Sequence, residues 1–158
     1  MDFIGDKTQI YTGELPATSI YPALKLSDFQ GMFQFLSNES ELNLTHQLTA
    51  ARAAIRSELK PLMATLKNDT DRPDLTLLSV LSLMHFEDEE TAKVFYIQSV
   101  FALAASYIVS VQISTDATKE AADRQQALSN KKEECLVMYR RAVDMLIYGH
   151  ETRMFEVL

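Results

Sequence analysis

The side chains that most often carry chemistry are few and scattered in this sequence. The three histidines, His46, His85 and His150, do not combine with other residues into a ligand set at metal-site spacing. A zinc site needs three or four converging nitrogen, sulfur or oxygen donors. The single cysteine, Cys135, falls on an apolar helical stripe, where a buried structural thiol is expected rather than a nucleophile. The residues therefore predict no metal, no cofactor and no catalytic nucleophile.

Sequence motifs of enzymes are missing as well. The chain contains no glycine-rich phosphate loop, no nucleophile elbow of a hydrolase and no paired-histidine metalloprotease motif. An acidic run, Glu87, Asp88, Glu89 and Glu90, lacks the spaced oxygen ligands and the glycine of a calcium loop. Carboxylates favour the positive end of a helix dipole, so this run is expected to begin a helix. We predict a protein that is not an enzyme.

A basic stripe is the more informative feature. Arg52, Arg56 and Lys60 are spaced four residues apart, so they share one face of a helix, where like charges repel weakly. Residues 43–67 carry four basic and one acidic group (+3), and residues 68–90 carry one basic and seven acidic groups (−6). We predict that the stripe meets acidic groups of a neighbouring chain, with the carboxylates of residues 87–90 as first candidates. A solvated helix face is the alternative.

Composition bounds the class of protein. The chain has 158 residues, with 15 basic and 22 acidic side chains and a net charge of −7. This length suits one domain, and the acidic balance argues against a dedicated nucleic-acid binder. Four glycines and four prolines are few for a fold with many turns, which favours long helices. The sequence predicts an all-α protein in a reducing compartment.

Periodicity predicts a compact bundle of three long helices and one short one. The short helix is expected to start at a capping box formed by Ser27 and Gln30. The long helices are expected over residues 43–67, 87–113 and 118–148, with Asn43 as an N-cap. Pro61 predicts a kink or break near Lys60, and Gly149 is a natural end for the last helix. Residues 75–86 are apolar but short, and either a helical turn or an irregular segment fits them.

Three regions follow from this pattern: an extended arm over residues 1–26, a helical domain over 27–149 and a tail over 150–158. The tail ends in alternating residues typical of a short β-strand, with Phe155, Val157 and Leu158 as its apolar members. Arm and strand are apolar and lack a local partner, so both are expected to bind other chains. Residues 94–113 carry no charge and are long enough to cross a membrane, but a helix buried on nearly all sides is the expected structure.

Several short motifs occur in a recognisable order. Lys93-Val94-Phe95-Tyr96 opens an alanine-rich stretch through Ala105, and Thr115-Asp116-Ala117-Thr118 through Ala122 breaks the pattern before the last helix. Tyr139-Arg140-Arg141-Ala142-Val143 precedes Gly149 and a short terminal segment. Ile20-Tyr21-Pro22, leading to Asp28, and Arg56-Ser57-Glu58-Leu59 fit more loosely. In order and spacing, residues 20–158 resemble the head completion and stabilisation proteins of contractile-tailed bacteriophages.

The resemblance implies a structural virion protein at the head-tail junction, assembled in the host cytoplasm. Such proteins bind the portal vertex after DNA packaging and form a ring, expected to be dodecameric, that retains the DNA. They offer a docking surface for a tail or neck terminator protein. Double-stranded DNA passes through the ring without sequence-specific binding, which net negative charge would assist. Two alternatives are a free-standing helical interaction or regulatory module and a small DNA-packaging subunit of the terminase type.

Overall fold

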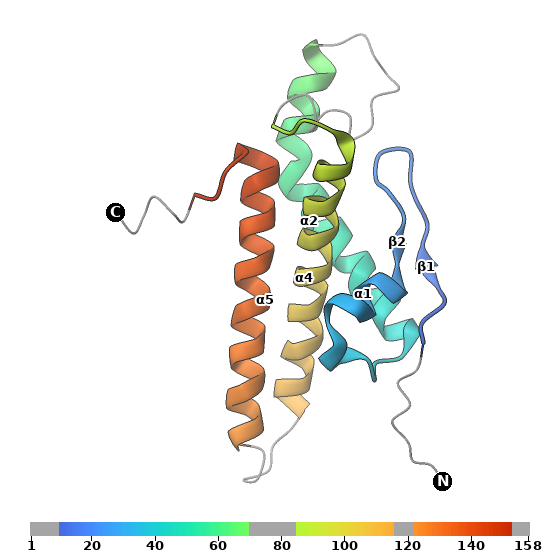
Figure 1. Ribbon diagram of the computed structural model, residues 1–158, viewed down its shortest axis with the longest axis vertical. Helices are drawn as coiled ribbons and strands as arrows, with labels where there is room; N and C mark the ends of the chain where they lie inside the picture. The colour runs from blue at the N-terminus through green and yellow to red at the C-terminus, as the bar shows by residue number, and fades with distance from the viewer. Residues whose placement is uncertain (1–9, 70–84, 116–121, 153–158) are drawn as a thin grey trace.

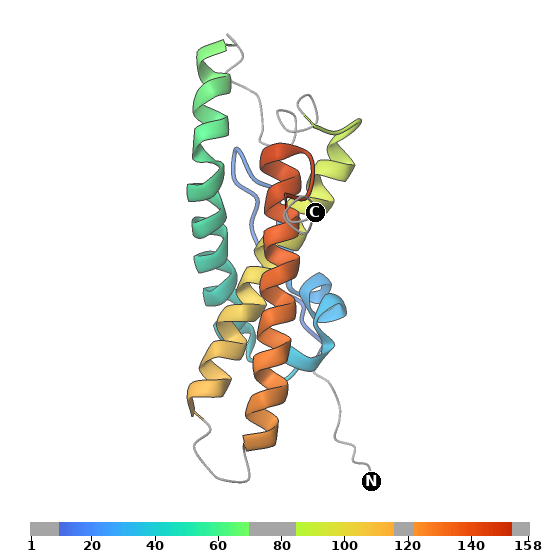
Figure 2. The same ribbon diagram turned by 90° about the vertical axis from the view of Figure 1, so that its left-hand side faces the viewer.

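Three long helices dominate the computed structural model, which describes residues 10–69, 85–115 and 122–152 (Figure 1). They are α2 (Glu41–Asp69), α4 (Glu89–Thr115) and α5 (Ala122–Tyr148). Helices α4 and α5 lie side by side and antiparallel, with the most extensive contact in the molecule (Figure 2). Helix α2 also packs on α4, whereas α2 and α5 touch at few positions. The prediction of an all-α bundle with three long helices is confirmed.

Helix α4 forms the centre of the core because its sequence leaves no polar face. Most of its apolar side chains are buried, as are two of its serines, Ser99 and Ser106. Among the described helices, α4 is the one long and apolar enough to cross a membrane. Of its most apolar stretch, 61% is buried inside the protein. This burial is what a central core helix requires. The fully buried members are Ala92, Tyr96, Ser99, Val100, Phe101, Ala102, Ala104, Ala105 and Val109.

The N-terminal region differs from the expectation. Strands β1 (Glu14–Leu15) and β2 (Leu24–Lys25) form an antiparallel pair, and α1 (Leu26–Met32) and the 3-10 helix η2 (Gln34–Leu36) follow. This segment lies on the side of α4 away from α5 (Figures 1 and 2). The expectation of a β element confined to the C-terminus is therefore wrong for the described residues.

Residues 10–26 belong to the protein's own core, so the prediction that this part of the arm binds other chains is wrong. Tyr21 stacks on Tyr96 of α4 with ring centroids 5.4 Å apart, and Phe29 meets Phe101 edge-on at 5.5 Å. The physical reason is that α4 is apolar all round and must be covered on the side that α5 leaves open. Five arm residues are buried: Tyr11, Leu15, Tyr21, Leu24 and Leu26. The first nine residues lie outside the described part of the chain.

Polar contacts fasten this segment to the start of α2. The hydroxyl of Tyr11 donates to the carbonyl oxygens of Glu39 (2.6 Å) and Ser37 (2.9 Å). The Glu41 carboxylate accepts hydrogen bonds from the backbone N–H groups of Thr12 (3.0 Å) and Gly13 (2.9 Å). Hydrogen bonds between residues so distant in sequence hold the extended segment in one register.

Two predicted helix starts are wrong. Helix α1 begins at Leu26 after Lys25, with no side-chain cap, so Ser27 and Gln30 form no capping box. The Gln30 side chain instead accepts a hydrogen bond from the Tyr11 N–H (3.2 Å). Helix α2 begins at Glu41, and the Ser40 hydroxyl accepts from the Asn43 N–H (3.1 Å), the geometry of an N-cap. Gln30 thus binds a residue distant in sequence instead of capping α1, and Ser40 caps α2 in place of Asn43.

The remaining boundaries agree better with expectation. Helix α2 ends at Asp69, close to the predicted residue 67, but it continues through Pro61, so the prediction of a break near Lys60 is wrong. Helix α4 follows Asp88, which accepts a hydrogen bond from the Thr91 N–H (2.7 Å). Gly149 ends α5 with a φ of 77°, and a Cβ there would lie 2.8 Å from His85 Nδ1, so glycine is required. The expected end of α5 is confirmed, while most of residues 75–86 and the strand at 155–158 lie outside the described residues.

Candidate interaction surfaces

The basic stripe on α2 is divided by the structure. Arg52 is half-buried, and its guanidinium donates to the Pro16 carbonyl oxygen at 2.9 Å. Arg56 and Lys60 are exposed. Burial raises the pKa of Tyr21, and the positive charges of Arg56 and Arg52 partly oppose that rise. Arg52 therefore has an intramolecular role in holding the strand pair, which the sequence pattern did not predict. Arg56 and Lys60 are the two members of the stripe that are exposed to solvent.

The acidic run lies where the sequence predicted it, at the start of α4. Glu87, Asp88, Glu89 and Glu90 are all exposed. The hydrogen bond from Thr91 holds the pKa of Asp88 below its ordinary value, as expected for a carboxylate that caps a helix. Only Asp88 is needed for this cap, so the other carboxylates add charge to the surface. Their pairing with the basic stripe of a neighbour stays a prediction.

Two side chains considered as a nucleophile or a metal ligand, Cys135 and His85, contribute to packing and to contacts between helices. Burial raises the pKa of the Cys135 thiol to about 11, which disfavours the reactive thiolate. A nitrogen of His85 (Nε2) lies 3.0 Å from the Ile147 carbonyl oxygen, tying the segment before α4 to the end of α5. Within the described ranges, no three histidine, cysteine or acidic side chains gather as a metal site would require. These side chains serve packing and helix ends there.

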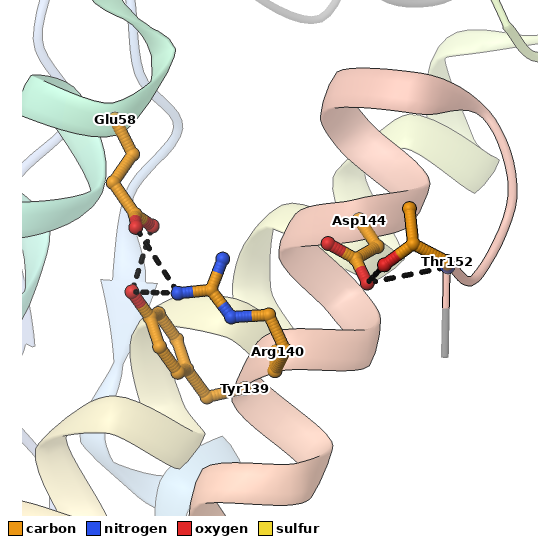
Figure 3. Close-up of polar contacts among 5 residues, drawn as sticks. All are labelled: Glu58, Tyr139, Arg140, Asp144 and Thr152. Atoms are coloured by element: carbon orange, nitrogen blue, oxygen red, sulfur yellow. Dashed lines mark hydrogen bonds and ion pairs between the residues drawn. The ribbon is translucent and has the colours of Figure 1, made fainter. Parts of the chain in front are cut away.

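A polar clamp joins α2 to α5 (Figure 3). The Tyr139 hydroxyl donates to Glu58 Oε2 at 2.7 Å, and Arg140 donates to Glu58 Oε1 at 3.3 Å. Burial, and then the hydrogen bond to Glu58, raise the pKa of Tyr139 far above its ordinary value. A tyrosine held neutral in this way positions helices rather than accepting protons. Sequence spacing could not reveal the clamp, because the two halves lie 81 and 82 residues apart.

A second polar contact holds the segment that follows α5. Asp144 is buried, with 3% of its surface exposed, and its Oδ2 accepts hydrogen bonds from Thr152 Oγ1 (2.7 Å) and Thr152 N (3.3 Å) (Figure 3). Arg141 forms an ion pair with Glu151 at 3.0 Å. The two contacts turn the chain back against α5 after Gly149.

A groove of about 620 Å³ lies beside this turn, between α4 and α5. Its apolar lining includes Phe95, Val137, Met138 and Ala142, and of these only Ala142 is fully buried. The polar lining consists of Gln98, Glu133, Glu134, Arg141 and Glu151. The lining therefore combines four apolar side chains with three carboxylates and one guanidinium group.

Comparison with protein-family models, with curated proteins and with solved structures gave no significant match.

Proposed function

We propose that this protein is a structural subunit of a bacteriophage head-tail connector. It binds the portal vertex after packaging, forms a ring that extends the DNA channel and presents a docking surface to the tail or neck. The identity of the assembly rests on the resemblance of residues 20–158 to the head completion and stabilisation proteins. The observation that carries self-assembly is the exposure of two oppositely charged surfaces on one chain, Arg56 with Lys60 and residues 87–90.

Opposite charges on different surfaces of one subunit suit a head-to-tail contact. Such heterologous contacts close into rings when the rotation between subunits allows it. An exposed ion pair contributes only about 0–1 kcal/mol, but a ring repeats it at every interface. The proposal also includes the partners expected from the resemblance: further copies of this chain, the portal and the neck protein, with DNA passing through and no membrane.

The chemistry of the described side chains supports a structural role rather than catalysis. Glu58, Tyr139 and Asp144 are engaged in contacts between elements. Burial keeps Cys135 in its thiol form. An active site needs a nucleophile, base or electrophile facing a substrate pocket, and these groups are instead used to fasten helices.

A charge swap tests the proposal. Arg56→Glu with Lys60→Glu should prevent ring formation on a portal protein, and adding Glu89→Lys with Glu90→Lys should partly restore it. Arg52 stays unchanged because it holds the strand pair. Native mass spectrometry of the protein with and without a portal reports the stoichiometry. Lys25→Glu, an exposed charge change on β2, is the matched control and should assemble normally.

The alternatives predict different results. A free-standing interaction module stays a monomer or dimer whether or not a portal is present. A small DNA-packaging subunit binds duplex DNA through the basic stripe, and fluorescence anisotropy would show binding that Arg56→Glu abolishes. Normal assembly of the Arg56→Glu, Lys60→Glu variant would show that the stripe is a solvated face. Salt should weaken a charge-paired ring, because the screening length falls from about 10 Å at 0.1 M to about 3 Å at 1 M.

A further inference from the structure

Two arginines lie side by side on α2 where the strand pair meets this helix. Arg52 and Arg56 are one helical turn apart, and β1 contacts α2. Arg52 donates to the Pro16 carbonyl oxygen at 2.9 Å, and its other N–H groups bond no described residue. Arg56 is exposed and forms no hydrogen bond or ion pair within the described part of the chain. The two positive charges therefore have no carboxylate partner among the described residues.

Two tyrosine hydroxyls lie within reach of these charges. Tyr21 is buried, with 7% of its surface exposed, and its hydroxyl has no hydrogen-bond partner in the described ranges. Burial raises the pKa of Tyr21, and the charges of Arg56 and Arg52 oppose that rise, which places the hydroxyl near both guanidinium groups. The ring of Tyr96 stacks on Tyr21 with centroids 5.4 Å apart. Its buried hydroxyl has no partner either, and the charge of Arg52 acts on it too.

A cluster of donors without acceptors fits a phosphate. A guanidinium group presents its N–H groups as a planar fork that bonds two phosphate oxygens at once, and a tyrosine hydroxyl can donate to a third oxygen. Such charge-assisted hydrogen bonds are shorter and stronger than neutral ones. Like charges one turn apart on a helix repel each other, and a dianion between them offsets that repulsion. A carboxylate has two oxygens and one charge, so it suits this cluster less well.

We propose that Arg52, Arg56 and Tyr21 form a binding site for a phosphate dianion, which is either free phosphate or the terminal phosphate of a small molecule. The bond to Pro16 holds Arg52 in place, so its remaining donors are already positioned for an anion. Lys60 is not part of the site, since the charges that act on Tyr21 are those of the two arginines. The site is complete within one chain, so the inference goes beyond the connector function and does not require a ring.

An NMR titration with inorganic phosphate tests the proposal on the full chain, without a portal. Sodium chloride keeps the ionic strength constant, and the pH is mildly alkaline so that phosphate is a dianion. The side-chain Nε–H resonances of Arg52 and Arg56 should shift and saturate together, with one phosphate bound per chain. Arginine resonances that do not shift, or that shift without saturating, would overturn the proposal.

Substitutions separate the site from a general effect of charge. Arg56→Gln should weaken phosphate binding about tenfold or more, because it removes a charge-assisted hydrogen bond. Tyr21→Phe removes a neutral donor and keeps the ring on Tyr96, so binding should weaken about threefold. Lys25→Gln is the matched control: it removes an exposed positive charge from β2 and should leave the affinity unchanged. Equal affinities for Arg56→Gln and Lys25→Gln would overturn the proposal.

Other ligands distinguish the sources of the phosphate. A sugar phosphate that binds more tightly than inorganic phosphate would identify a small-molecule ligand, and the reverse order would identify free phosphate. Dimethyl phosphate, which carries one charge as a phosphodiester of DNA does, should bind more weakly than both, and so should acetate. Equal binding of acetate or dimethyl phosphate would overturn the assignment to a phosphate dianion. None of these outcomes depends on a ring, so failure here is separate from failure of the connector function.

Discussion

Helix α4 is covered differently on two of its sides. On the side away from α5, the N-terminal segment completes the core (Figure 1). Tyr96 and Phe101 are fully buried there, beneath Tyr21 and Phe29. At the groove, Phe95 and Met138 remain half-buried. Both sides have aromatic side chains from the same helix. The difference therefore comes from what covers the helix rather than from its composition. We call the side covered by the N-terminal segment the closed side, and the side at the groove the open side.

The largest expected effect is a difference in the free energy of unfolding between substitutions on these two sides. Phe29→Ala should lower the free energy of unfolding by about 3–5 kcal/mol, because it removes a fully buried ring from the closed side. Met138→Ala should cost about 1 kcal/mol, since the side chain is already half-buried and its loss leaves less cavity. Urea unfolding followed by circular dichroism measures both values.

Phe35→Ala serves as the control for removing an aromatic ring. This ring is 42% exposed and lies 5.3 Å from Lys131 Nζ in a cation–π contact, so its loss should cost no more than about 1 kcal/mol. Equal losses of stability for Phe29→Ala and Met138→Ala would remove the distinction between a closed and an open side.

An intermediate effect is expected at the clamp, which links α2 and α5 where they otherwise touch little. Glu58→Gln removes the charge that Tyr139 and Arg140 share and should cost about 1 kcal/mol. A double-mutant cycle with Tyr139→Phe should show that the two losses are not additive, because they remove one interaction. Glu133→Gln, an exposed neighbour on α5, should change stability little. Additive losses would show that the clamp does not act as a unit.

Long periodic segments were predictable from the sequence, and single long-range contacts were not. The apolar residues of α2, spaced three or four positions apart, and the charge-free stretch of α4 depend on local geometry alone, so both helices were located within a few residues. The covering role of residues 10–26 depends on a surface that α4 creates far along the chain. Arm residues such as Tyr11 looked like contacts for another chain because their partners, Ser37 and Glu39, are not local.

The candidate site follows the same rule. The like-charge spacing of Arg52, Arg56 and Lys60 identified a helix face correctly, but it could not show that Arg52 binds the Pro16 carbonyl. Glu58 and Tyr139 gave no sequence signal as a pair because a whole helix separates them. The sequence likewise gives no hydrogen-bond partner for two serines of α4, Ser99 and Ser106. In the structure both are buried within the chain and donate to carbonyls of their own helix.

The smallest expected effect concerns a buried hydroxyl group on the side of α4 that the N-terminal segment covers. The Tyr96 hydroxyl is buried and has no hydrogen-bond partner among the described residues. A buried polar group without a partner destabilises the folded state by about 1–3 kcal/mol. Tyr96→Phe removes the group and keeps the ring that stacks on Tyr21. At neutral pH it should therefore leave stability unchanged or raise it by up to about 1 kcal/mol.

Stability at alkaline pH shows whether the effect of Tyr96→Phe comes from the buried hydroxyl or whether the site simply tolerates the substitution. Burial raises the pKa of Tyr96 above its ordinary value of 10.0, so the folded state holds its phenolic proton longer than the unfolded state does. Stability from this difference is fully present below pH 10 and is lost as the pH rises towards the folded-state pKa. Tyr96→Phe should make the loss of stability above pH 10 shallower, measured by urea unfolding across that range. Equal slopes for the unchanged protein and Tyr96→Phe would contradict the burial of an ionisable hydroxyl beneath Tyr21.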